Sequence, residues 1–253
     1  MATFLLIHGA GSDSWDWHRV APLLVAAGHQ VHAPDLPCAD DSAGFEEYAR
    51  AALASLPDEV VEPVVVVGHS MGAFTAVLAC EQLTGSALVL VAPMIPAPGE
   101  TGGQWWAATE QEEAQKAFAQ EQGRDPQAPM DSIETFLHDV EPRIVEVGIA
   151  HFRDQSGTPF TTAWAGPEWP AERTMVIVGR DDRLFPLPFQ RRVCQERLGI
   201  EPVVVPSGHM PALACPDELA AHLLAAANEA GPQTLRPQTP KHQSTKLQGV
   251  APS

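Results

Sequence analysis

A run of four valines followed by two closely spaced glycines is the feature that most constrains the fold of this chain. Val64–Val67 is β-branched throughout and predicts a buried strand, and the pentapeptide Gly68-His69-Ser70-Met71-Gly72 follows it directly. A helix-forming segment comes next. Glycines lack a Cβ, so the chain can turn sharply and the helix can pack closely against the strand. We therefore predict that Ser70 lies in a strained conformation on a tight strand-to-helix turn.

Strands and helices are predicted to alternate on both sides of this turn. Apolar runs predict further strands at 3–8, 31–33, 87–91, 175–178 and 202–205. Apolar positions at helical spacing predict helices near 14–27, 44–56, 72–83, 187–198 and 213–229. Such alternation is typical of a doubly wound, mostly parallel sheet, so we predict an α/β fold.

The sequence changes character between Pro93 and Pro170. Glycines and prolines interrupt the alternation, and helical spacing returns only at 108–121 and 132–147. We interpret residues from about 95 to 170 as a helical cap inserted into a single domain that spans 1–230. Residues 231–253 contain no acid and few apolar side chains, so we predict a disordered C-terminal tail.

Composition excludes several classes of partner. The formal net charge of −17 argues against binding to nucleic acid or to an anionic membrane, and no apolar run is long enough to span a bilayer. The first apolar run, at 3–7, has no cationic segment before it and is too short for a signal peptide. We expect a small-molecule substrate, and a homodimer is left open.

Four cysteines, Cys38, Cys80, Cys194 and Cys215, show no C-x-x-C spacing, which favours reduced structural thiols and a cytoplasmic protein. No phosphate-binding loop, dinucleotide fingerprint or cysteine cluster is present, so we expect no cofactor and no metal. Glu134 and His138 share a helical spacing that metals also use, but no third ligand accompanies them.

The serine of the central turn has candidate partners later in the chain. A serine hydroxyl needs a base within hydrogen-bond reach and a third group that orients the base. In a doubly wound sheet these groups are expected at the carboxyl ends of later strands. Asp182 and His209 lie in loops that follow two such strands, and Asp181 is a rival for the acid.

In its combination of motifs the chain, to about residue 229, resembles the α/β-hydrolase family, in particular small esterases related to plant methylesterases and hydroxynitrile lyases. The matching segments occur in the order and at the separations of that family. They are His8-Gly9-Ala10, Ala27-Gly28-His29-Gln30-Val31, Asp35-Leu36, Gly68-His69-Ser70-Met71-Gly72, the G-x-x-D-x-x-x-P of 179–186, and Gly208-His209-Met210.

The resemblance implies a role for each matching residue. Ser70 is expected to be the nucleophile, His209 the general base and then acid, and Asp182 the orienting carboxylate. The backbone N–H groups of Met71 and Ala10 are expected to form the oxyanion hole.

Two positions separate esterases from the resembling lyases. The lyases carry a threonine where this chain has Gly9 and a lysine where it has Met210. A thioether cannot donate a proton to a leaving group as an ammonium can. These positions favour an esterase, and we also expect both to line the substrate pocket, together with Trp105 and Trp106 of the cap.

We therefore predict a serine hydrolase that cleaves a small, largely apolar carboxylic ester through an acyl-enzyme. Three alternatives stay open: a hydroxynitrile lyase-like or C–C bond-cleaving enzyme with the same triad, a cofactor-free perhydrolase or haloperoxidase, and a non-catalytic ligand-binding member of the fold. His8 and His69, which flank the glycine-rich loops, are expected to be structural.

Overall fold

A single parallel sheet forms the centre of the protein. The computed structural model describes residues 1–170 and 173–230. Within them, six strands pair in the order β2-β1-β3-β4-β5-β6, and every neighbouring pair is parallel. The strands are β1 (Thr3–Ile7), β2 (Gln30–His32), β3 (Val64–His69), β4 (Ala87–Val91), β5 (Thr174–Gly179) and β6 (Val203–Val205). The predicted α/β fold is confirmed.

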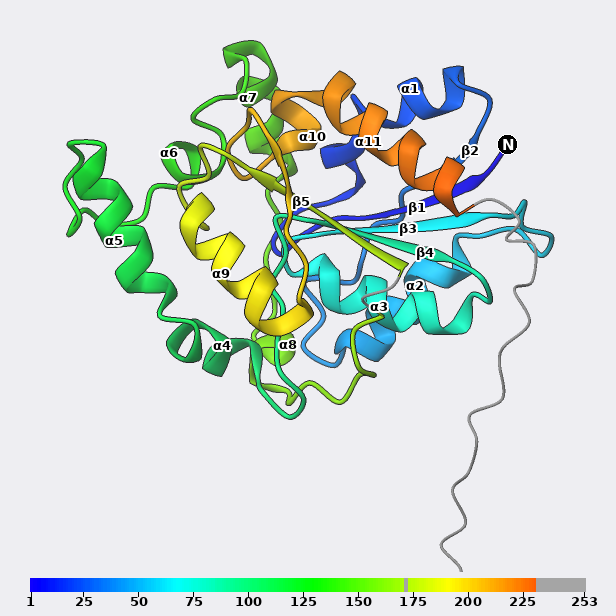
Figure 1. The fold of residues 1–253 in the computed structure, drawn as a ribbon, viewed down its shortest axis with the longest axis horizontal. Helices are drawn as coiled ribbons and strands as arrows, with labels where there is room; N and C mark the ends of the chain where they lie inside the picture. Colours follow the sequence, from blue (N-terminus) through cyan, green and yellow to red (C-terminus); the bar gives the residue numbers. More distant parts are fainter. Residues whose placement is uncertain (171–172, 231–253) are drawn as a thin grey trace, which may run out of the picture.

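Helices cover both faces of the sheet (Figure 1). One face packs against α2 (Phe45–Ala54), α3 (Gly72–Gln82) and α9 (Leu187–Leu198). The other packs against the 3-10 helix η1 (Ser14–Trp17), α1 (Ala21–Ala26) and α11 (Pro216–Glu229). Alternate residues of each central strand therefore enter opposite cores, as Val66 and Val67 of β3 do. This explains why β3 is continuously apolar.

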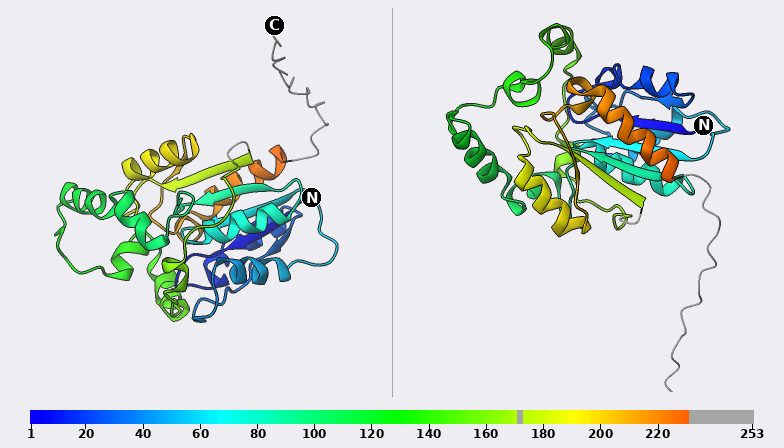
Figure 2. Two further views of the ribbon diagram at one scale, coloured as in Figure 1. Left: turned by 90° about the horizontal axis from the view of Figure 1, so that it is seen from below. Right: turned by 45° about the horizontal axis from the view of Figure 1, so that its top comes forward.

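The segment between β4 and β5 forms a group of short helices, which we call the cap. Its members are α4 (Gly102–Ala108), α5 (Gln111–Glu121), α6 (Ser132–Phe136), α7 (Pro142–Gly148), η2 (Ile149–His151) and α8 (Thr158–Thr161). Figures 1 and 2 show that they lie beyond the end of the sheet opposite to the N-terminus of β1. Because all strands run parallel, this is the end at which the strands finish.

Three helices that the spacing predicts as continuous are each divided in two. The helix near 14–27 consists of η1 and α1, that of 132–147 of α6 and α7, and that of 213–229 of α10 (Pro211–Ala214) and α11. In each case the second piece begins with a proline at its first or second position. Proline lacks the N–H that would continue a preceding helix, so the apolar periodicity persists while the backbone breaks.

No helix within 1–170 and 173–230 is both long and apolar enough to cross a bilayer. The predicted tail, 231–253, lies outside the described residues. The four cysteines are free thiols, and burial raises the pKa of Cys194 to about 12. The cytoplasmic location inferred from them stays a prediction.

Candidate active site

Ser70 occupies the sharp turn between β3 and α3. Its φ angle of 53° lies in the left-handed region, which residues with a side chain rarely adopt. The surrounding backbone holds it there: the Ser70 N–H donates to the Val91 carbonyl at 2.9 Å, and its own carbonyl accepts from the N–H groups of Ala73 and Met94, each at 3.2 Å. The predicted strained turn is therefore present, and neighbouring backbone fixes the position of the serine.

The two glycines of the pentapeptide are required by close packing. A Cβ on Gly68 would lie 2.6 Å from the Cβ of Ala76, and one on Gly72 would lie 2.4 Å from the carbonyl oxygen of His8. Real Cβ atoms do not approach other atoms so closely. Only glycine therefore lets α3 begin directly beside β1 and β3.

His209 and Asp182 form a buried hydrogen-bonded pair. His209 Nδ1 lies 2.8 Å from Asp182 Oδ2, and the side chains are 2% and 0% exposed. An ionised carboxylate only accepts hydrogen bonds, so His209 must donate from Nδ1. That tautomer leaves Nε2 free to accept a proton.

The acid is held by its own turn. Asp182 Oδ1 accepts from the backbone N–H groups of Leu184 and Phe185 at 2.8 and 2.9 Å, and Gln190 Nε2 lies 3.3 Å from Oδ2. The rival Asp181 instead forms an exposed ion pair with Arg180. Asp182 is therefore the carboxylate beside the histidine.

His69 and His8 support the loops of the site. His69 Nε2 lies 2.8 Å from the carbonyl oxygen of His209, to which it donates. Burial above all, and the nearby His209, lower the pKa of His69 to about 3, so the ring is neutral. His8 accepts from the Leu36 N–H at Nε2 and donates to the Gly9 carbonyl from Nδ1. Both have the structural role expected from the sequence.

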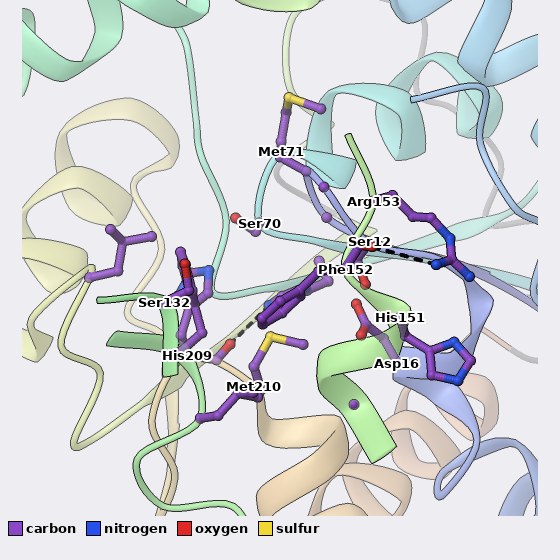
Figure 3. Close-up of a pocket in the computed structure, with 18 of the residues that line it drawn as sticks. Ser12, Asp16, Ser70, Met71, Ser132, His151, Phe152, Arg153, His209 and Met210 are labelled. Atoms are coloured by element: carbon purple, nitrogen blue, oxygen red, sulfur yellow. Dashed lines mark hydrogen bonds between the residues drawn. The ribbon is translucent and has the colours of Figure 1, made fainter. Parts of the chain in front are cut away.

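A cavity of about 410 Å³ contains both Ser70 and His209 (Figure 3). This volume is suited to a small organic molecule. Most of its lining is apolar, and includes Met94, Trp106, Phe136, Leu137, Phe160, Phe185 and Leu213. Gly9 and Met210, expected in the pocket, also line it.

Two residues that line the cavity have backbone N–H groups without an acceptor among the described residues. Ala10 and Met71 both line the cavity. Among the residues that the structure describes, neither amide donates a hydrogen bond. Met71 directly precedes the first turn of α3, where the helix dipole favours negative charge. The arrangement fits the predicted oxyanion hole.

Trp105 and Trp106 are adjacent in α4, but their side chains have different surroundings. Trp106 lines the cavity, whereas Trp105 does not. Trp105 is fully buried, and its Nε1 donates to the Ile95 carbonyl at 3.0 Å. The expectation that both contact substrate is therefore corrected: adjacent helical positions point in different directions, and Trp105 anchors the cap.

Five polar pocket residues were missed by the sequence analysis: Ser12, Asp16, Ser132, His151 and Arg153. Asp16 is only 5% exposed, and burial, its largest influence, raises the pKa of its carboxyl to about 7. Its only sequence signal is an acid between two tryptophans in a segment otherwise suited to a helix.

The expectation of no metal is not tested by a structure without ligands, but the suspected pair has other partners. Glu134 forms an ion pair with Arg183 at 2.6 Å, and His138 Nε2 lies 3.1 Å from the Asp181 carbonyl. Within the described ranges, no three His, Cys, Asp or Glu side chains are grouped for a metal ion.

The chain belongs to the alpha/beta hydrolase family, whose model matches residues 4–222. A probable esterase, PIR7A, of rice (Oryza sativa) is 36% identical over 113 residues, which are 40% of this chain and 42% of the relative. Polyneuridine aldehyde esterase of Rauvolfia serpentina is 34% identical over 110 residues, 39% of this chain and 41% of the relative. The chain thus matches about two fifths of the length of these relatives. The resemblance to plant esterases is confirmed.

Solved structures share the fold over nearly the whole chain. A pyrethroid hydrolase of Sphingobium faniae JZ-2 superposes with a TM-score of 0.67 and 23% identity, covering 90% of this chain and 97% of the other. A methylesterase, MES16, of Arabidopsis gives a TM-score of 0.67 at 20% identity, covering 90% of this chain and all of the other. At such low identity the likeness establishes the fold alone.

Proposed function

We propose that this protein is a serine esterase that uses Ser70, His209 and Asp182. The observation that carries the proposal is the His209–Asp182 pair, with 2.8 Å between Nδ1 and Oδ2, at the cavity that contains Ser70. The pair leaves His209 Nε2 unprotonated, as a general base requires. The esterases among the relatives of this chain support the same activity.

In the proposed acylation step, Ser70 Oγ attacks the ester carbonyl carbon while His209 Nε2 accepts the hydroxyl proton. The carbonyl oxygen becomes an oxyanion, to which the Ala10 and Met71 N–H groups donate. The intermediate then expels the alkoxide, which takes the proton from His209 and leaves as the alcohol. The Asp182 carboxylate stabilises the imidazolium that exists between these transfers.

The acyl-enzyme is cleared by the same groups. His209 Nε2 accepts a proton from water as the water oxygen attacks the acyl carbon. The second tetrahedral intermediate then breaks its bond to Ser70 Oγ, which takes the proton back from His209. A carboxylic acid is released. No group besides the triad, the two amides and water is required.

The lining of the cavity supports an apolar substrate. Trp106, Phe136 and Phe160 come from the cap, whereas Met94 and Phe185 come from loops after β4 and β5. The volume of about 410 Å³ supports a small ester. We regard 1–230 as one hydrolase domain in which the cap, at about 95–170, covers the site.

The test is hydrolysis of a panel of aryl and alkyl esters, together with trapping by an organophosphate. We expect a covalent adduct on Ser70 by mass spectrometry, and a loss of at least about a thousandfold in kcat for Ser70→Ala and for His209→Ala. Ester hydrolysis that persists in Ser70→Ala would refute the proposal.

The choice of substrate distinguishes the esterase from the lyase-like alternative. Gly9 and Met210 line the cavity, and Met210 provides no proton donor for a departing cyanide. We therefore expect esters to be hydrolysed and cyanohydrins and β-diketones to be left intact. Peroxide-dependent halogenation and ligand binding without turnover are the outcomes that would favour the perhydrolase and receptor alternatives.

A further inference from the structure

Asp16 brings a buried carboxyl group to the wall of the catalytic cavity. It belongs to η1, on the segment after β1, and it lines the same cavity as Ser70 and His209. Its Oδ2 atom is buried and has no hydrogen-bond partner among the described residues. Figure 3 shows the carboxyl directed toward Ser12 and the interior of the pocket.

The two basic side chains of the cap nearest to this carboxyl are paired with a different acid. His151 Nδ1 lies 3.0 Å from Asp13 Oδ2, and Arg153 forms an ion pair with the same carboxylate. Asp13 therefore pairs with both of these basic side chains. The charged and titratable groups near Asp16 are Asp13, His151, Arg153 and His209, and the Ser12 hydroxyl is its hydrogen-bonding neighbour.

These surroundings favour the neutral acid. Burial is the largest influence on the Asp16 carboxyl and raises its pKa to about 7, whereas the Ser12 hydrogen bond opposes this increase. A neutral carboxyl has one O–H donor and an acceptor oxygen. An unpartnered buried group of this kind destabilises the fold, so a ligand that supplies the missing hydrogen bonds would be bound in preference to one that does not.

We propose that Asp16, with Ser12 beside it, forms a polar subsite that binds a hydroxyl group of the ester substrate. The inference rests on the proposed esterase function and specifies its substrate class. The substrate is an apolar ester that carries a hydroxyl group, placed so that this group reaches Asp16 while the scissile carbonyl lies at Ser70. A hydroxyl group both donates and accepts, and so it complements both functions of a neutral carboxyl.

The same surroundings disfavour an ammonium group at this position. Arg153 also lines the cavity but is paired with Asp13, whereas His209 becomes positively charged during the proposed reaction. A substrate cation would be repelled by the His209 imidazolium, and a neutral hydroxyl group would not. A hydroxyl is therefore the better partner.

The experiment compares matched esters. The probes are methyl 3-phenylpropanoate, its 2-hydroxy and 3-hydroxy derivatives, and 2-hydroxyethyl 3-phenylpropanoate beside its propyl ester. We expect wild-type protein to prefer at least one hydroxylated ester by about tenfold in kcat/KM, the size of one or two neutral hydrogen bonds. Asp16→Leu should abolish that preference, and Asp16→Asn, which still donates and accepts, should retain most of it.

Controls separate the subsite from the chemistry. Asp58→Leu makes the same change at an exposed position outside the cavity and should leave the preference unchanged. Binding of the same esters to Ser70→Ala, measured by calorimetry, should show the same hydroxyl preference without turnover, and Ser70→Ala/Asp16→Leu should lack it. If Asp16→Leu does not fold, Asp16→Ala removes the same groups with a smaller side chain.

Three results would overturn the inference. Wild type could prefer no hydroxylated ester, or its preference could be unchanged in Asp16→Leu. A preference for phenylalanine methyl ester that Asp16→Asn abolishes would instead indicate a subsite for an ammonium group. Ester hydrolysis that does not depend on Ser70 would instead refute the proposed function. In that event the binding measurements would still decide the role of Asp16.

Discussion

The buried carboxyl of Asp16 predicts how the stability of this protein depends on pH. Burial raises its pKa from 3.8 to about 7, so the folded protein holds the proton more tightly than the unfolded chain does. The resulting stabilisation is complete below about pH 4 and is lost as the pH rises to about 7. Asn at this position has a similar shape and does not titrate. Wild type should therefore lose stability relative to Asp16→Asn as the pH increases.

The size of the effect follows from the two pKa values. The difference between 3.8 and about 7 corresponds to about 4 kcal/mol at about 1.4 kcal/mol for each tenfold change in proton affinity. This is the upper limit over the whole titration. Proton linkage predicts that wild type loses about 2.5 kcal/mol of its free energy of unfolding, relative to Asp16→Asn, between about pH 5 and about pH 8.

The assay is urea unfolding of wild type and Asp16→Asn at several pH values across this range, followed by circular dichroism. The buried His8 and His69 also titrate differently in the folded and unfolded states, but both proteins contain them, so subtraction removes their contribution. We expect the free energy of unfolding of Asp16→Asn, minus that of wild type, to increase by about 2.5 kcal/mol. A difference constant to within about 0.5 kcal/mol would refute the assignment of a neutral buried acid.

Three further predictions concern the site and its support. Asp182→Asn should reduce kcat by about a thousandfold or more, because the amide cannot stabilise the imidazolium, whereas Asp181→Asn should remain within a few-fold of wild type. Steady-state kinetics of both variants test this, and a large loss in Asp181→Asn alone would make Asp181 the acid. Gly72→Ala should destabilise the protein by about 2 kcal/mol or more, since its Cβ would lie 2.4 Å from a backbone oxygen, and an unchanged melting temperature would contradict this packing. Trp106→Ala should raise KM for aryl esters several-fold with a smaller effect on kcat; an unaltered KM would place the substrate elsewhere in the cavity.

The sheet and the central turn could be predicted from sequence because local patterns determine them. Four consecutive valines indicate a strand buried on both faces, and the flanking glycines indicate the turn at Ser70. The assignment of His209 and Asp182 depended on the order of elements in a parallel sheet, which brings loops after successive strands to one end. Their hydrogen bond of 2.8 Å agrees with that reasoning.

The pocket could not be predicted in the same way because distant segments build it. Trp105 and Trp106 are identical in type and adjacent, and only the rotation of α4 decides which one contacts the cavity. Asp16 is distinctive only because the fold buries it and pairs the neighbouring His151 and Arg153 with Asp13 instead. No local pattern records an environment of that kind.

Two hydrogen bonds join the cap to the loop after β1. Gly11, next to the Ala10 amide, accepts a backbone hydrogen bond from Arg153 and donates one to the Gln155 side chain, at 2.9 and 3.0 Å. An outward displacement of 153–155 would break these two hydrogen bonds, which hold Gly11 next to Ala10. The cap and the loop that carries the proposed oxyanion-binding amide of Ala10 are thus joined directly, so a displacement of one is coupled to a displacement of the other.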